Sequence, residues 1–136
     1  DPSERLAWVR EHFGGHDTVG AVATDGERVA TATSTGGRWF ALAGRVGDVP
    51  QIGSGFYASE AGGASATGAG EDIARETLAR EAVSHLEDGT DAQTAADRTI
   101  ADFDVARTGD AGVIVMSVDG DAGSAYNSES MQVATE

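Results

Sequence analysis

Two Asp-Gly pairs, each between two β-prone runs, constrain the fold of this chain more than any other feature. They are Asp25-Gly26 and Asp119-Gly120. An Asp-Gly pair favours the positive φ angles of a tight hairpin turn. The sequence therefore predicts antiparallel hairpins over residues 18–34 and 112–127.

Helical periodicity fills the segment between the hairpins. Four apolar residues at four-residue steps predict one continuous helix over 71–87; they are Ala74, Leu78, Ala82 and Leu86. A second helix is predicted over 92–103, with Thr90 and Gln93 as a capping box. Its inward side chains are predicted to be Ala92, Ala96, Ile100 and Phe103.

Two shorter elements are predicted outside those segments. Residues 63–67 form a short strand, whose small side chains indicate that another element packs closely against it. Residues 3–13 form a helix with Ser3 as N-cap and Gly14-Gly15 as its stop. This order of strands, helices and strands indicates one α/β domain in 136 residues.

Thr18 is the candidate nucleophile. It follows His16-Asp17 and opens the first predicted strand, and the run Thr33-Ser34-Thr35-Gly36-Gly37 ends the second. A threonine at a free N-terminus carries its own base, because an α-amine titrates at roughly 7.7 to 8.0 and accepts the hydroxyl proton. The sequence predicts a threonine hydrolase that first cuts its own Asp17–Thr18 bond.

Three further glycine-rich blocks follow in order: Gly44-Arg45-Val46-Gly47-Asp48, then residues 52–58, then Ala66-Thr67-Gly68-Ala69-Gly70-Glu71. Together with the threonine blocks, they resemble the β-subunit of the N-terminal-nucleophile asparaginases. That group holds the plant-type asparaginase/isoaspartyl peptidases and the glycosylasparaginases. The resemblance covers about residues 16 to 131.

The resemblance implies a fold and an assembly. The fold is the Ntn-hydrolase four-layer αββα sandwich, of which residues 18–136 supply the β-subunit half. Residues 1–17 are then the end of an α-subunit made from the same precursor, and an (αβ)2 assembly is expected. The chain starts at Asp1 rather than at methionine, which leaves room for a removed leader.

The resemblance also implies roles around the nucleophile. Thr35 orients the Thr18 hydroxyl, with Thr33 as its rival for that position. Thr67 and Gly68 stabilise an oxyanion, because a hydroxyl and a backbone N–H aimed at a developing negative charge lower its energy.

Arg45 and Asp48 are the candidate substrate-binding pair. A guanidinium holds a carboxylate bidentately, and a carboxylate three residues away holds an ammonium. The alternative is a surface ion pair of little energetic value. The family motif favours substrate binding and adds the Gly70 carbonyl as a further partner of the ammonium.

The expected reaction is hydrolysis of the side-chain amide of L-asparagine, of β-aspartyl (isoaspartyl) peptides, or of both, through a threonine β-aspartyl ester. The substrate is a small molecule, and no metal or organic cofactor is required. Alternatives are an amidase for N-glycosylated asparagine, a threonine endopeptidase, and a non-catalytic subunit or uncleaved precursor. His12 and His85 are predicted on helix surfaces, without metal-ligand spacing to Asp or Glu.

Composition narrows the possible partners. The formal net charge of −14 argues against nucleic-acid binding, and all nine basic residues are arginine. An acidic surface without lysine suits a halophilic protein in molar salt, the alternative being an ordinary acidic cytosolic protein. Cysteine is absent, and no run is apolar enough to span a membrane. A cytoplasmic location is expected.

Three positions depart from the family pattern. Residues 38–43 do not resemble the family's usual segment, although they border the expected substrate pocket. Val49 replaces a small polar residue, and Ser130 replaces a glycine in the closing motif. The first departure leaves the preference for the leaving group open.

Overall fold

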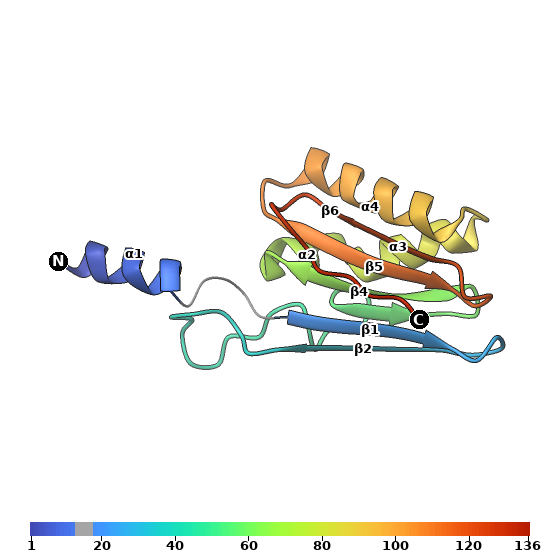
Figure 1. Cartoon of the computed structure of the whole chain (residues 1–136), viewed down its shortest axis with the longest axis horizontal. Coiled ribbons are helices and arrows are strands. Elements are labelled where there is room, and N and C mark those ends of the chain that lie inside the picture. Colours follow the sequence, from blue (N-terminus) through green and yellow to red (C-terminus); the bar gives the residue numbers. More distant parts are fainter. Residues whose placement is uncertain (13–17) are drawn as a thin grey trace.

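The computed structural model describes residues 1–12 and 18–136. The elements in chain order are α1 (Pro2–His12), β1 (Thr18–Thr24), β2 (Val29–Thr35), β3 (Phe56–Ala58), β4 (Gly62–Gly68), α2 (Gly70–Glu76), α3 (Leu78–Glu87), α4 (Ala92–Ala106), β5 (Ala111–Ser117) and β6 (Ala122–Tyr126). The helix α1 lies apart from the remaining elements (Figure 1). Within the described ranges, no helix has the length and apolar character needed to cross a bilayer.

The strands form two antiparallel sheets that pack face to face. β1 and β2 make a two-stranded sheet, and the second sheet has the order β3-β4-β5-β6. The helices α3 and α4 cover one face of the larger sheet, and the β1-β2 hairpin lies against its other face (Figure 1). The result is a mixed α/β domain, and both hairpins predicted from the Asp-Gly turns are confirmed.

β4 lies in the middle of these layers and is buried on both faces over most of its length. Its glycines allow the close contact. A Cβ atom at Gly63 would lie 2.6 Å from Thr31 Cγ2 and 2.7 Å from Val29 Cγ1, both on the hairpin. This confirms the predicted close packing against residues 63–67.

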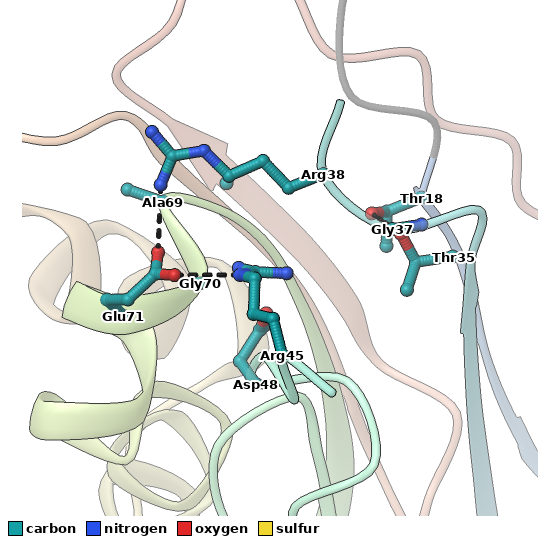
Figure 2. Close-up of a pocket in the computed structure, with 10 residues that line it drawn as sticks. Thr18, Thr35, Gly37, Arg38, Arg45, Asp48, Ala69, Gly70 and Glu71 are labelled. Atoms are coloured by element: carbon teal, nitrogen blue, oxygen red, sulfur yellow. Dashed lines mark hydrogen bonds and ion pairs between the residues drawn. The ribbon is translucent and has the colours of Figure 1, made fainter. Parts of the chain in front are cut away.

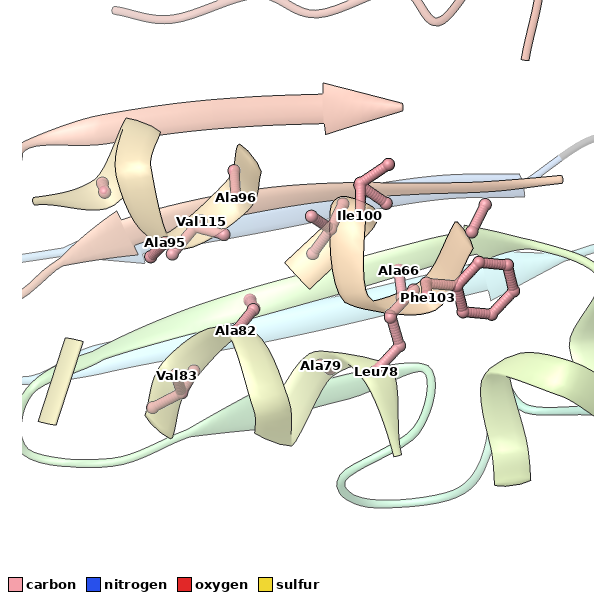
Figure 3. Close-up of a cluster of buried hydrophobic side chains, with 14 of the residues drawn as sticks. Ala66, Leu78, Ala79, Ala82, Val83, Ala95, Ala96, Ile100, Phe103 and Val115 are labelled. Atoms are coloured by element: carbon pink, nitrogen blue, oxygen red, sulfur yellow. The ribbon is translucent and has the colours of Figure 1, made fainter. Parts of the chain in front are cut away.

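The main core lies between the four-stranded sheet and α3 and α4 (Figure 3). The predicted inward residues of α4 are all buried, as are Leu78, Ala82 and Leu86 on α3. Ala74 is only half-buried, and Ile73 beside it occupies the core. Helical periodicity therefore identified most of the core-facing positions.

The predicted continuous helix over 71–87 is wrong, because it is interrupted at Thr77. This residue has φ 49° and ψ 51°, which is left-handed geometry, and it separates α2 from α3. Two carbonyls outside the helix accept hydrogen bonds from the first turn of α3: Ala79 N donates to Ser54 O at 3.2 Å, and Arg80 N donates to Gly53 O at 2.8 Å. Tertiary hydrogen bonds thus satisfy the new helix start.

Both predicted helix caps shift by a residue or two. The side chain of Asp91, not Thr90, caps α4 by accepting a hydrogen bond from Thr94 N at 2.9 Å. α1 begins at Pro2, so Ser3 lies inside the helix and donates its N–H to Asp1 Oδ1 at 2.9 Å. The predicted end of that helix lies outside the described residues, and the three-residue strand β3 was not predicted.

Phe103 provides a test of the core. Its side chain is 2% exposed and ranks among the largest fully buried side chains. Phe103→Ala in the full-length protein is expected to lower the free energy of unfolding by about 3–5 kcal/mol, because it removes buried area and leaves a cavity. Chemical denaturation measures the change.

Val105→Ala on the same helix is the control, since Val105 is 90% exposed and its truncation should change stability by less than about 0.5 kcal/mol. Equal effects of the two substitutions would contradict the assignment of Phe103 to the core.

Candidate active site

A small cavity opens where the N-terminal end of β1, the C-terminal end of β2 and the start of α2 meet. We call it the Thr18 cavity; its volume is about 120 Å³, below the range typical of drug-sized pockets. Six residues predicted for the site line it: Thr18, Thr35, Arg45, Asp48, Gly68 and Gly70. Its other lining residues are Gly37, Arg38, Ala69 and Glu71 (Figure 2).

The register of the hairpin brings two threonine hydroxyls together. Thr18 and Thr35 are paired opposite one another in the β1-β2 ladder. Thr18 Oγ1 donates to Thr35 Oγ1 at 3.3 Å, and the backbone N–H of Gly37 donates to the same Thr35 oxygen at 3.1 Å. The Thr35 hydroxyl is therefore placed to orient the Thr18 hydroxyl.

Thr33 is engaged elsewhere. Its Oγ1 donates to Gly55 O at 2.9 Å and shares a 2.6 Å hydrogen bond with Ser65 Oγ on β4. These bonds connect the hairpin to the larger sheet. Of the two rival threonines, Thr35 is the one whose hydroxyl contacts Thr18.

Glu71 fixes the guanidinium of Arg45. Arg45 Nε donates to Glu71 Oε1 at 2.8 Å, and Arg38 Nη1 lies 3.4 Å from Glu71 Oε2 (Figure 2). The hydrogen bond from Arg45 is the main cause that lowers the pKa of Glu71 to about 2, and the same bond raises the pKa of Arg45. Both groups are therefore charged at neutral pH.

Asp48 is the buried carboxylate of the cavity. The residue is 6% exposed, and within the described ranges its Oδ2 is buried without a hydrogen-bond partner. Burial raises the pKa of Asp48, while the positive charge of Arg45 acts in the opposite direction. A buried carboxylate oxygen without a partner is costly unless a cation pairs with it.

Gly70 makes room for both charged groups. A Cβ atom at this position would lie 2.6 Å from Asp48 Oδ1 and 3.1 Å from Arg45 Nη2. Arg45 and Asp48 therefore converge on the same backbone position. Any side chain at position 70 would collide with the carboxylate of Asp48 and crowd the guanidinium of Arg45.

Hydrogen bonds within the loop hold Asp48 in place. Asp48 O accepts from Gln51 N at 2.9 Å and from Gly55 N at 3.2 Å. The following carbonyls of Gly53 and Ser54 accept from the first turn of α3, as described above. The break at Thr77 thus serves to anchor the loop that carries the charged pair.

Thr67 and Gly68, which were predicted to act together on an oxyanion, line different cavities. Gly68 lines the Thr18 cavity, whereas Thr67 lines a second cavity together with Ser65 and Met131, and Thr18 lines both cavities. Gly68 has φ 133° and lies too close to Asp110 O for any larger residue. Both positions adjoin Thr18, one in each cavity.

Glu71 and Arg38 are the site residues that sequence reasoning missed. Glu71 was named only as the last residue of a glycine-rich block, and Arg38 only as part of a segment unlike the family pattern. The available signal for Glu71 was its position directly after Gly68-Ala69-Gly70. A lone acidic residue after a glycine-rich block does not reveal which arginine it will contact.

Two other predictions concern residues that are not among those lining the Thr18 cavity. Asp17, half of the predicted cleavage site, lies outside the described residues. His85 was predicted on a helix surface without metal spacing, and this is wrong: its side chain is 16% exposed, and its ligand atom lies within 4.8 Å of those of Glu81 and Asp102. That trio spans α3 and α4 and does not line the Thr18 cavity.

The arrangement suits a zwitterionic amino-acid derivative. Arg45 offers a fixed cation for a carboxylate, Asp48 offers an unpaired buried oxygen for an ammonium, and Thr18 offers a hydroxyl. A ligand held by the first two groups would present its side chain to the third. The cavity thus has groups of opposite charge suited to the two ends of an amino acid, and a hydroxyl beside them.

Comparison with known proteins agrees with this geometry. The family model described as asparaginase matches residues 4–136. A plant-type L-asparaginase of Thermococcus kodakarensis is 45% identical over 118 residues, which are 86% of this chain and 39% of the relative. A plant-type L-asparaginase of Pyrococcus furiosus is 43% identical over 118 residues, with the same coverage.

A human protein named isoaspartyl peptidase/L-asparaginase is 44% identical over 116 residues, which are 84% of this chain and 38% of that protein. The chain thus spans less than half the length of the relatives that it matches.

Proposed function

The chain belongs to the asparaginase family, and from this premise we propose that it is the nucleophile-bearing part of an amidohydrolase acting on L-asparagine and β-aspartyl peptides. One observation carries the proposal. The Thr18–Thr35 hydroxyl pair and the Arg45–Asp48 charge pair line the same cavity. This is the geometry expected of a site that holds an amino acid by its α-groups and attacks its side-chain carbonyl.

Substrate binding is the first step of the proposed reaction. Arg45 binds the α-carboxylate through Nη1 and Nη2, because its Nε is occupied by Glu71. Asp48 binds the α-ammonium through its unpaired oxygen, and this pairing compensates for the burial of the carboxylate. Holding both α-groups places the amide carbon beside the Thr18 hydroxyl.

Acyl transfer follows. The α-amine of Thr18 takes the proton of its hydroxyl, and Oγ1 attacks the amide carbon of the substrate side chain. A backbone N–H at Gly68 and the Thr67 hydroxyl stabilise the oxyanion. The carbon–nitrogen bond breaks, and ammonia or an amine leaves with the proton. Water then hydrolyses the β-aspartyl ester and regenerates Thr18.

A free amine at Thr18 requires cleavage of the Asp17–Thr18 bond. We propose that the Thr18 hydroxyl attacks the Asp17 carbonyl in the full-length precursor, and that hydrolysis of the resulting ester releases the new N-terminus. Residues 18–136 then form the β-subunit, and residues 1–17 belong to the α-subunit.

The outer face of the β1-β2 hairpin supports the proposal of a further helical layer, which would complete an αββα sandwich. The hairpin alternates between half-buried and exposed positions, and its outer face carries small apolar residues, among them Ala21, Ala23 and Ala32, together with Val19, which is 69% exposed. We propose that helices of the α-subunit cover this face. We further propose that two copies of the processed α- and β-subunits associate as an (αβ)2 assembly.

Paired substrates test the proposal in the full-length, processed protein. Hydrolysis of L-asparagine is compared with that of succinamic acid, which lacks the ammonium, and of 3-aminopropanamide, which lacks the carboxylate. Each omission is expected to lower kcat/KM by about 100-fold, because it leaves a charged partner in the cavity unpaired.

Cleavage of a β-aspartyl dipeptide and of N-glycosylated asparagine is measured in parallel. The dipeptide is expected to be cleaved faster than the glycosylated compound, because a relative 44% identical to this chain is named isoaspartyl peptidase/L-asparaginase. Cleavage of the glycosylated compound alone would instead support the glycosylasparaginase alternative. Absence of hydrolysis of every amide would contradict the proposed function.

A further inference from the structure

Arg38 lines the Thr18 cavity but has no part in the reaction proposed above. The residue before it, Gly37, donates its N–H to Thr35 Oγ1, which also accepts the hydrogen bond from the Thr18 hydroxyl. From there the Arg38 side chain extends across the cavity and ends beside Glu71, on the opposite wall from Thr18 (Figure 2). The guanidinium of Arg38 thus lies across the cavity from the hydroxyls of Thr18 and Thr35 (Figure 2).

The two arginines of the cavity are held differently. Arg45 contacts Glu71 Oε1 at 2.8 Å, and its side chain is 23% exposed. Arg38 contacts Glu71 Oε2 at 3.4 Å, and its side chain is 56% exposed. That long contact occupies one of the five N–H donors of a guanidinium. Arg38 is therefore exposed and has donors available to bind an incoming anion in the cavity.

We propose that Arg38 binds the carboxylate of the leaving amino acid when a β-aspartyl dipeptide occupies the Thr18 cavity, which makes it a specificity-determining residue. The inference rests on the proposed function. With the aspartyl α-groups on Arg45 and Asp48 and the scissile carbonyl at Thr18, the leaving amine is the part of the substrate that points out of the cavity. Its carboxylate is one carbon from the scissile nitrogen, within reach of a side chain rooted beside Thr18.

Charge balance supports this assignment. Arg38, Arg45, Asp48 and Glu71 together give a net charge of zero, which suits zwitterionic asparagine. A β-aspartyl dipeptide has the same α-groups and one additional carboxylate. In a chain with a formal net charge of −14, that additional anion is repelled unless a nearby cation receives it. Arg38 is the cation in the cavity that is not committed to the aspartyl moiety.

The consequence is selectivity for the leaving group. Asparagine releases ammonia, which carries no carboxylate and gains nothing from Arg38. A dipeptide with a free C-terminal carboxylate gains a charge-assisted pair, and the same dipeptide with a C-terminal amide does not. Arg38 should therefore set the ratio of kcat/KM between the acid and the amide of one dipeptide.

The test measures that ratio in the full-length, processed protein, with β-aspartyl-leucine and β-aspartyl-leucinamide as substrates. The wild-type ratio is expected to favour the acid by about tenfold, the effect of one charge-assisted pair near the surface. Arg38→Gln is expected to bring the ratio close to one, whereas Arg38→Lys should retain part of the preference. Arg28→Gln, which removes an exposed arginine from the β1-β2 turn, is the matched control and should keep the wild-type ratio.

The outcomes separate the inference from the function on which it rests. If wild type cleaves both dipeptides and Arg38→Gln leaves the acid-to-amide ratio unchanged, the inference is wrong while the hydrolase assignment stands. If Arg28→Gln lowers the ratio as much as Arg38→Gln does, the preference reflects overall charge, and the inference is again wrong. Failure of wild type to cleave either dipeptide or asparagine would overturn both.

Discussion

Thr18→Ala is expected to abolish hydrolysis of asparagine and cleavage of the Asp17–Thr18 bond at the same time. The substitution removes the Thr18 hydroxyl, which lies 3.3 Å from Thr35 Oγ1. No other described residue that lines the cavity places a hydroxyl at the start of β1. Loss of a nucleophile costs about 10⁴-fold or more in kcat. Ammonia release measures the first effect, and intact-mass analysis of the purified precursor measures the second.

Thr18→Ser is the matched control, because it keeps the hydroxyl and removes only the methyl group. The Thr18→Ser precursor should cleave its bond after Asp17 more slowly than wild type and still yield a chain that begins at residue 18. That chain should hydrolyse asparagine at a measurable rate. Circular dichroism should show that both variants are folded. Full hydrolytic activity in a chain shown by mass to be uncut before residue 18 would refute the proposed role of the Thr18 amine.

The predictable part of the fold depends on local signals. The two hairpins follow from Asp25-Gly26 and Asp119-Gly120, because the turn chemistry and the flanking β-prone runs agree. The break at Thr77 has no such signal: the apolar period runs through it, and neither glycine nor proline is present there. The helix α3 begins at Leu78 because its first turn donates hydrogen bonds to the carbonyls of Gly53 and Ser54, which lie more than 20 residues away in the sequence.

The residues of the candidate site that belong to sequence motifs could be predicted, whereas their contacts with residues outside the motifs could not. Six residues chosen from sequence line one cavity, because the β1-β2 register and the close packing of β4 bring their blocks together. The partnership of Glu71 with Arg45 and Arg38 was missed, since it joins the start of α2 to a loop that no periodicity describes. The unpaired oxygen of Asp48 depends on burial, which emerges only from the packed loop.

Arg45→Ala is expected to raise KM for asparagine by about 100-fold or more in the full-length, processed protein, with a smaller effect on kcat. The substitution removes the proposed bidentate partner of the substrate carboxylate, and it removes little core volume because Arg45 is partly exposed. Arg75→Ala is the matched control: Arg75 is an exposed arginine that pairs with Asp72 and lies outside the cavity, so KM should not change. Steady-state kinetics and a thermal melt of each variant make the comparison.

The Arg45 variant should also change how KM depends on pH. Burial raises the pKa of Asp48, and the positive charge of Arg45 opposes that rise, so removal of Arg45 moves the pKa further upward. In the proposed mechanism Asp48 binds the substrate ammonium only when it is ionised, so a higher pKa of Asp48 means that protonation weakens binding at a higher pH. As the pH rises, KM of Arg45→Ala should therefore continue to fall at pH values where KM of wild type has already levelled off. An unchanged KM would show that Arg45 does not bind the substrate carboxylate. Identical pH profiles in wild type and variant would show that Arg45 does not keep Asp48 ionised.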